Sequence, residues 1–119
     1  MEYLLMATET ADAFAARTDP ERTAEYWDAW NGFIGALAQS GVMRNAAGLM
    51  PPTMSTTVRL RDGHREVQDG PFAESKEHLG GYFVIDVADL DEALAWAERC
   101  PSATYASVEV RPLLPPMPN

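Results

Sequence analysis

Two amphipathic helical patterns lie among several strand-like runs, and this small number of helices constrains the fold more than any other feature. The first helix is predicted to begin at Asp19-Pro20-Glu21, which combines a capping side chain, a proline suited to the first turn and an acid at the positive helix end. Gly41 ends it. The second is predicted to begin after Asp89, with Glu92 at its third position, and to end at Pro101. Two helices can cover only one face of a sheet.

Both helical patterns carry an apolar stripe, which is more often part of a core than a cofactor site. We therefore assign both stripes to the core. The first stripe consists of Tyr26, Trp27, Trp30, Phe33, Ile34, Leu37 and Ala38, and the second of Leu90, Ala93, Leu94, Ala97 and Cys100.

Three strand-like runs flank these helices. Tyr3 to Met6 is a short apolar run that opens the sheet. Tyr82 to Val87, which follows Gly80-Gly81, is rich in β-prone residues. Ala106 to Arg111 alternates between apolar and polar residues and is the last predicted strand.

The segment between the first helix and Gly80 is predicted to hold a loop and a hairpin. Residues 42–54 are rich in methionine and small residues, and we expect a loop that forms a pocket wall or a partner surface. Thr56 to Arg61 then alternates, and Asp62-Gly63 joins it to a short run from His64 to Gln68. An Asp-Gly pair between two such runs is typical of a β-hairpin.

This order predicts an α+β ferredoxin-like sandwich, β-α-β-β-α-β with an extra short strand, in a single domain over residues 1–119. Prolines mark an extended tail from about residue 112. We expect a second copy to cover the sheet face without helices, which gives a homodimer packed sheet to sheet as a dimeric α+β barrel. The side chains expected on that face are Arg59, Arg61, Tyr82, Val84, Ser107 and Glu109.

Charge and cysteine content narrow the classes of partner and compartment. The net charge is −9, which argues against nucleic acid and anionic membrane surfaces as partners, because phosphate contacts need clustered Lys and Arg. The single cysteine, Cys100, cannot form an intramolecular disulfide, so a reducing cytoplasm is expected. Glu2 stands where a signal peptide needs positive charge, and no apolar run is long enough to span a membrane.

A longer motif follows the hairpin. Asp69-Gly70-Pro71-Phe72-Ala73-Glu74-Ser75-Lys76-Glu77, with Leu79-Gly80-Gly81-Tyr82 after it, resembles the signature of the DGPF family within the YCII-related superfamily. Members usually carry Thr in place of Ser75 and often Gln in place of His78. The resemblance extends to Tyr3-Leu4-Leu5-Met6, Thr56-Thr57-Val58-Arg59, Asp89-Leu90-Asp91-Glu92-Ala93-Leu94 and Val108-Glu109-Val110-Arg111-Pro112.

The resemblance implies a ferredoxin-like dimeric α+β barrel and a range of functions. Better-known YCII relatives are small lyases, including a dehydrochlorinase, that are thought to use a His-Asp pair for proton transfer. Asp69 is the candidate for the acidic member, although the first helix and the early strands contain no histidine. DGPF proteins also resemble products encoded beside extracytoplasmic-function sigma factors, which implies a regulatory role and association with a sigma factor for some of them.

Asp69 and His78 are the candidate catalytic residues. The Asp69 carboxylate either bonds the amides of its own Asp-Gly-Pro turn or, at the barrel mouth, transfers a proton. His78 is close to Asp69 in sequence, and histidine titrates near neutral pH, so it is the candidate relay. His64 is expected at an exposed hairpin tip.

Four further residues are candidates for binding substrate. Lys76 is the only lysine and would orient an anionic group or pair with an acid of its own segment. Arg59 would pair with an acidic residue or bind a ligand carboxylate. Phe72 is expected in the core or in a pocket wall, and Tyr82 on the uncovered sheet face.

Three functional hypotheses follow. The first is a small-molecule-binding protein that works as a cofactor-independent lyase or isomerase by acid/base proton transfer. The second is a non-catalytic regulatory or accessory protein linked to a sigma factor or a biosynthetic cluster, and the third is a structural dimer. The sequence contains no Cys/His cluster or phosphate-binding loop, so neither a metal site nor a cofactor is predicted.

Overall fold

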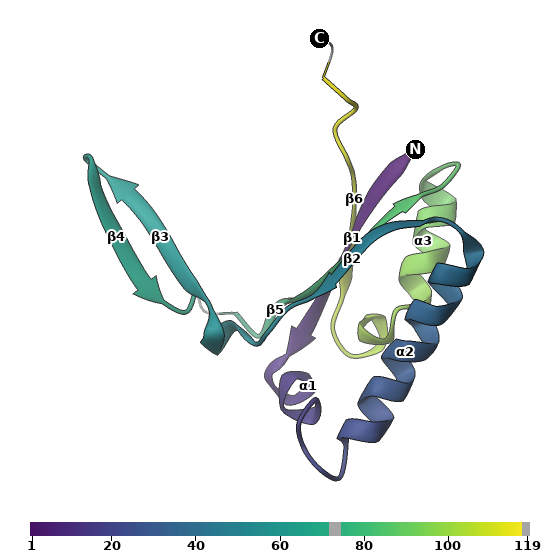
Figure 1. Cartoon of the computed structure of the whole chain (residues 1–119), viewed down its shortest axis with the longest axis horizontal. Helices are drawn as coiled ribbons and strands as arrows, with labels where there is room; N and C mark the ends of the chain where they lie inside the picture. The colour runs from purple at the N-terminus through teal and green to yellow at the C-terminus, as the bar shows by residue number, and fades with distance from the viewer. Residues whose placement is uncertain (72–74, 118–119) are drawn as a thin grey trace.

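The computed structural model describes residues 1–71 and 75–117. A four-stranded antiparallel sheet has the order β2-β5-β1-β6 and forms the body of the protein. A separate two-stranded hairpin consists of β3 and β4 and extends away from this body (Figure 1). The strands are β1 (Glu2–Thr10), β2 (Met43–Gly48), β3 (Thr56–Arg61), β4 (His64–Asp69), β5 (Glu77–Asp86) and β6 (Val108–Pro112).

Helices α2 (Thr23–Ser40) and α3 (Leu90–Arg99) lie on one face of the sheet, and the short α1 (Ala11–Ala16) follows β1 directly (Figure 1). Two 3-10 turns, η1 (Pro52–Met54) and η2 (Pro101–Thr104), complete the fold. Among the described residues, no helix combines the length and apolarity that crossing a membrane requires. The core between helices and sheet consists of Tyr3, Leu5, Ala7, Trp30, Phe33, Leu37, Phe83, Ile85, Val87, Ala93, Ala97 and Cys100.

Strand β1 shows why the sheet has two different faces. Its odd-numbered positions from Tyr3 to Glu9 are buried under the helices, while the even-numbered positions are half-buried on the other face. Strand β5 alternates in the same way, with Phe83 and Ile85 buried and Tyr82 and Val84 half-buried. Successive side chains of a strand point to opposite faces, so Tyr82 and Val84 lie on the face opposite to α2 and α3.

Several predictions from the sequence are confirmed. The protein belongs to the α+β class and has antiparallel sheets. Asp62 and Gly63 have φ values of 52° and 78°, which is the left-handed pair that a two-residue hairpin turn requires, and His64 lies exposed beside it. The Asp89 side chain accepts a hydrogen bond from the Glu92 amide at 2.9 Å and caps α3.

The prediction that residues 42–54 form a loop is wrong. Met43–Gly48 is β2, an edge strand paired with β5. Its residues, which include Ala46, Ala47 and Gly48, have low β-propensity, so the local sequence gives little sign of a strand. Pairing with β5 decides its structure, because Gly48 lies opposite Gly81, where small residues let the backbones meet.

The hairpin therefore does not belong to the main sheet, and this corrects two placements. Arg59 and Arg61 were expected on the uncovered face of the main sheet, but both lie on β3, which pairs with β4 in the two-stranded sheet. The uncovered face holds Tyr82, Val84 and Glu109, as expected, since Val84 pairs with Leu4 and Glu109 with Met6.

Other predicted boundaries also shift. Helix α2 begins at Thr23, because the Asp19 carboxylate accepts a hydrogen bond from the Glu21 amide in a preceding turn. Helix α1 was not predicted, since it has only six residues. Strand β5 begins at Glu77, so Gly80-Gly81 lies within it, at a register shift against β1. Four residues assigned to the core are exposed, namely Trp27, Ala38, Leu90 and Leu94.

Candidate functional site

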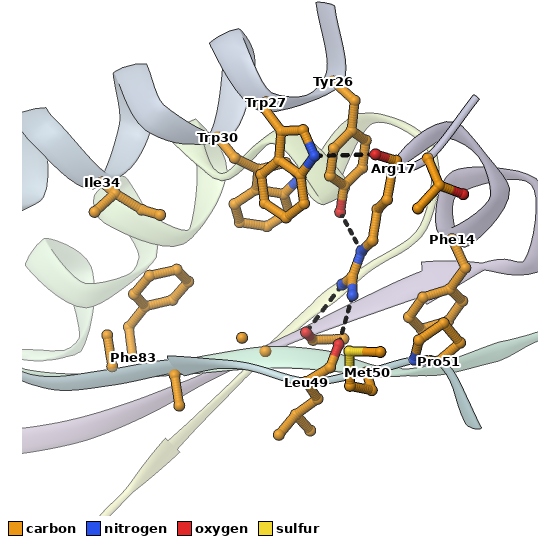
Figure 2. A pocket seen from close by; sticks show the side chains of 16 residues that line it. Phe14, Arg17, Tyr26, Trp27, Trp30, Ile34, Leu49, Met50, Pro51 and Phe83 are labelled. Carbon is orange, nitrogen blue, oxygen red and sulfur yellow. Dashed lines mark hydrogen bonds between the residues drawn. The ribbon is translucent and has the colours of Figure 1, made fainter. Parts of the chain in front are cut away.

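A cavity lies between the helices and the β2-β5 edge of the sheet. Its volume is about 730 Å³, within the range of small-molecule pockets. Figure 2 shows α2 above it, with Trp27, Trp30 and Ile34 on its lower side, and Phe83 below on the sheet. The remaining walls are mostly apolar and include Phe14, Leu49, Met50 and Pro51.

Arg17 is the charged residue in the wall of this cavity. It follows α1, and its guanidinium connects three parts of the chain (Figure 2). The Nε atom donates to the Tyr26 hydroxyl at 3.0 Å, Nη1 donates to the Leu49 carbonyl, and Nη2 donates to the Gly80 carbonyl at 3.1 Å. The guanidinium also lies 4.8 Å from the centre of the Phe14 ring. Arg17 thus fixes the segment after β2 against β5.

A buried carboxylate lies behind Arg17. Glu9 is 1% exposed, and its Oε2 atom lies 3.6 Å from Nη2 of Arg17. The Tyr26 hydroxyl donates to Glu9 Oε2 at 2.7 Å, and the Tyr105 hydroxyl donates to Oε1 at 2.6 Å. The charge of Glu9 is therefore balanced by one cation and two hydroxyl donors, as a buried carboxylate requires.

Both tyrosine hydroxyls are held in their protonated form. Burial raises the pKa of Tyr26 above its usual value, and the hydrogen bond to the Glu9 carboxylate raises it further, while Arg17 acts in the opposite direction. Burial and Glu9 likewise raise the pKa of Tyr105. Tyr26 lines the cavity and can exchange a proton with Glu9 along an existing hydrogen bond.

Gly80 makes this arrangement possible. A Cβ atom on Gly80 would lie 2.6 Å from Cγ of Glu9 and 3.2 Å from Nη2 of Arg17. No side chain fits between β5 and the Glu9 side chain, so glycine is required by space at this position.

The structure does not bring the predicted site residues together. Asp69 and Arg59 are exposed on the hairpin, and Lys76 is exposed just before β5. His78 is half-buried and lines a second, smaller cavity of about 350 Å³, which shares Leu49, Met50 and Pro51 with the first. Tyr82 is half-buried on the uncovered sheet face. Phe72 lies outside the described residues.

Glu9 and Arg17 were not predicted as functional residues, although the sequence holds one signal for Glu9. Tyr3, Leu5 and Ala7 point to the buried side of β1, and Glu9, two residues further along, points to the same side. An acid on the buried side of an alternating strand needs partners and is a site candidate. Arg17 gives no comparable local signal, since its partners come from α2, β5 and the segment after β2.

Within residues 1–71 and 75–117, no three His, Cys, Asp or Glu side chains are grouped so that they could hold a metal ion. The polar groups on one side of the cavity include the Arg17 guanidinium and the Tyr26 hydroxyl, and the Glu9 carboxylate behind them interacts with both. This set of groups suits hydrogen bonding and proton transfer.

Comparison with known proteins places the chain in a family. An uncharacterized protein of Rhizobium meliloti (strain 1021) is 46% identical over 77 residues, and the match covers 63% of this chain and 62% of that protein, less than two thirds of its length. The fold is similar to that of 5-chloro-2-hydroxyhydroquinone dehydrochlorinase from Burkholderia phenoliruptrix AC1100, solved in complex with 2,5-dihydroxybenzoquinone. That match has a TM-score of 0.55 and 13% identity, and it covers 96% of this chain and 94% of the other. The YCII-related domain model matches residues 1–116, and the protein therefore belongs to the YCII-related family.

Proposed function

We propose that the protein binds a small, largely apolar organic molecule in the cavity beside Trp27 and Trp30 and acts on it as a cofactor-independent lyase or isomerase by proton transfer. The observation that supports this proposal is that one cavity combines mostly apolar walls with a polar side. Its walls are mostly aromatic and aliphatic, while one side holds the Tyr26 hydroxyl, hydrogen-bonded to the buried Glu9 carboxylate. A few placed polar groups in an apolar pocket are typical of ligand sites.

The polar groups of the cavity favour an uncharged ligand with a hydroxyl or enol group. Three of the five N–H groups of the Arg17 guanidinium donate hydrogen bonds within the protein, and Glu9 balances its charge. The Tyr26 proton is also used, so Tyr26 offers its oxygen as an acceptor. A ligand hydroxyl can donate to that oxygen, whereas a carboxylate would find no unbalanced cation there. The fold neighbour's ligand, 2,5-dihydroxybenzoquinone, shares the ring hydroxyl groups of this class, but it is acidic and ionises below neutral pH.

Proton transfer would proceed through Tyr26 to Glu9. As a substrate proton moves to the Tyr26 oxygen, the original hydroxyl proton of Tyr26 moves to Glu9 Oε2, and Glu9 becomes a neutral acid. Tyr26 is uncharged before and after the transfer, so its raised pKa is no obstacle. Arg17, which donates to the same oxygen, stabilises charge that develops on it.

The other predicted site residues enter as separate proposals. We propose His78 as a second acid/base group, because its cavity shares the wall at Leu49, Met50 and Pro51. Asp69 remains a proposed acid, and Arg59, Lys76 and Phe72 remain proposed binding residues. We also propose a homodimer through the uncovered sheet face, where half-buried apolar side chains such as Val84 and Tyr82 support a contact between sheets.

Binding can be measured with resorcinol, a diphenol that is uncharged at neutral pH, by quenching of tryptophan fluorescence, since Trp27 and Trp30 line the cavity. Ala46→Phe would fill the cavity from β2 and is expected to abolish quenching. Ala95→Phe, on the exposed side of α3, is the matched control and should bind as the wild type does. Equal quenching in the wild type and Ala46→Phe would contradict a ligand site in this cavity.

Proton transfer can be followed as exchange of the ring hydrogens of bound resorcinol with D₂O, measured by NMR. The wild-type protein should accelerate exchange, and Tyr26→Phe should reduce the acceleration by roughly 100-fold, a typical contribution of one acid/base group. Binding without any acceleration would contradict the catalytic part of the proposal. It would support instead the accessory role linked to a sigma factor, which co-purification of such a factor would test directly.

A further inference from the structure

The β3–β4 hairpin presents an apolar face that nothing in the described chain covers. Val58 lies directly opposite Val67 in the strand pairing, and Leu60 lies two residues further along the same face. These three side chains are 62%, 55% and 73% exposed. Figure 1 shows the hairpin extending well beyond the sheet and on the far side from α2 and α3.

A hairpin of this kind needs a packing partner. Two isolated strands are at best marginally stable in water, and independent stability requires a third strand or an apolar surface to pack against. Each strand has six residues, and all of them are exposed except Thr57, which is half-buried. The ordered hairpin with its apolar face is therefore suited to a contact with another molecule.

The distribution of charge indicates which molecule packs against the hairpin. Residues 56–69 hold three of the nine basic residues and three of the 18 acidic residues, so the hairpin is formally neutral and the rest of the chain carries all nine negative charges. Two such bodies repel each other when they approach. A neutral hairpin with Arg59, Arg61 and Arg65 meets an acidic body without that repulsion, and Arg65 lies opposite Leu60 on the apolar face.

We propose that the β3–β4 hairpin is an arm that packs its Val58, Leu60 and Val67 face on the body of a second copy of this chain. The proposal rests on the homodimer proposed above and adds a second contact to it. Two-fold symmetry makes the contact reciprocal, so each copy gives one arm and receives one. The proposed site residue Asp69, which pairs with Thr56, lies on the packing face of this arm and would lie beside the partner in the dimer, whereas Arg59 lies on the opposite face.

The test uses the full-length chain and light scattering across a range of protein concentrations. Val58→Asp/Leu60→Asp places two charges on the apolar face and should raise the dimer dissociation constant by about 10-fold or more, since burial of a Val or Leu side chain contributes on that scale. His64→Asp is the matched control, because it adds charge near the same end of the hairpin but on the opposite face. It should dimerise as the wild type does.

The outcomes separate this proposal from those on which it rests. A wild-type dimer with an unchanged dissociation constant in Val58→Asp/Leu60→Asp would overturn the arm and leave the sheet-face dimer in place. A wild-type monomer would overturn both, while ligand binding in the cavity would be unaffected. Hydrogen exchange gives a second measurement, since amides of residues 56–69 should lose protection when the dimer is diluted, and those of β1 should not. Concentration-independent exchange in the hairpin of a dimer would also overturn the arm.

Discussion

The Tyr26 hydroxyl on α2 donates a hydrogen bond of 2.7 Å to the Glu9 carboxylate on the buried face of β1. This bond joins the wall of the cavity to a carboxylate that is 1% exposed. Glu9 also accepts a hydrogen bond from Tyr105 and lies beside Arg17, so this one carboxylate contacts α2, the segment after α1 and the segment before β6. The stability of the fold and the chemistry of the cavity depend on the same side chain.

Glu9→Ala is expected to lower the free energy of unfolding by about 3 to 5 kcal/mol, the usual cost of removing one partner of a buried ion pair. The substitution leaves Arg17 without its counter-charge and two tyrosine hydroxyls without an acceptor. Urea denaturation measures the change. Glu98→Ala, an exposed acid on α3, is the control and should alter stability by less than about 0.5 kcal/mol. Equal effects of the two substitutions would contradict a structural role for Glu9.

Gly80→Ala is expected to destabilise the protein by about 1 to 3 kcal/mol, the range for overpacked buried sites. The new Cβ would lie 2.6 Å from Glu9 Cγ, and Glu9 cannot move without breaking its bonds to both tyrosines. Gly48→Ala provides the control, because a Cβ there meets nothing within 4 Å. Thermal unfolding of both variants tests this, and a Gly80→Ala protein as stable as Gly48→Ala would show that the site accepts a methyl group.

The sequence predicted the parts of the fold that depend on local signals. The Asp62-Gly63 turn and the Asp89 cap each need only a few adjacent residues, and both are confirmed. Strand β2 could not be predicted, because its low-propensity residues become a strand only by pairing with β5. The place of the hairpin was missed for the same reason, since alternation predicts a strand but not the sheet it joins.

The candidate site was less predictable than the fold. The sequence directed attention to the motif at residues 69–82, but the cavity is built mainly from α2, β2 and the segments that follow α1 and β2, with β5 contributing Gly80, Gly81 and Phe83. Arg17 binds carbonyl oxygens of Leu49 and Gly80, and any residue type provides a carbonyl, so no side-chain pattern records these contacts. Two of the three glycines of the motif are explained sterically, by Glu9 behind Gly80 and by the Ala47 carbonyl 3.0 Å from a Cβ on Gly81.

The stability of the protein should fall as the pH rises above about 10, the usual pKa of tyrosine. Burial and Glu9 raise the pKa values of Tyr26 and Tyr105 in the folded state, so the folded protein keeps protons that the unfolded chain releases. Their contribution is complete below the unfolded pKa and is lost with rising pH. Urea midpoints measured from pH 8 upwards should decrease less steeply in Tyr26→Phe than in the wild type. Parallel curves would mean that Tyr26 titrates in the folded protein as it does in the unfolded chain.

Asp89→Ala is expected to reduce the free energy of unfolding by about 1 kcal/mol, the typical value of a helix N-cap. Its carboxylate accepts from the Glu92 amide, while the Glu92 side chain accepts from the Ala88 amide, so the two residues cap α3 together. Asp89→Ser retains a capping oxygen and should recover most of the loss. Chemical denaturation compares the three proteins, and equal stability of the Ala and Ser variants would exclude capping as the cause.

Arg17→Lys is expected to loosen the wall of the cavity while leaving the positive charge in place. One planar guanidinium bonds the Tyr26 hydroxyl and the carbonyls of Leu49 and Gly80, whereas a lysine ammonium is a compact point charge that cannot reach all three. The loss of these charge-assisted bonds should cost about 2 kcal/mol. It should also accelerate exchange of the Leu49 amide, which donates to the Gly80 carbonyl at 2.9 Å.

Amide hydrogen exchange monitored by NMR distinguishes this local effect from general destabilisation. The Leu49 amide should exchange faster in Arg17→Lys at a denaturant concentration where the core amide of Ile85 is unchanged. Arg99→Lys is the matched control, because the Arg99 guanidinium stacks on Trp96 at 4.6 Å on α3, away from the cavity, and its replacement should leave Leu49 protected. If Arg17→Lys also left Leu49 protected, the backbone hydrogen bond from Leu49 to Gly80 would be enough to hold the segment after β2. Arg17 would then not be needed to hold it.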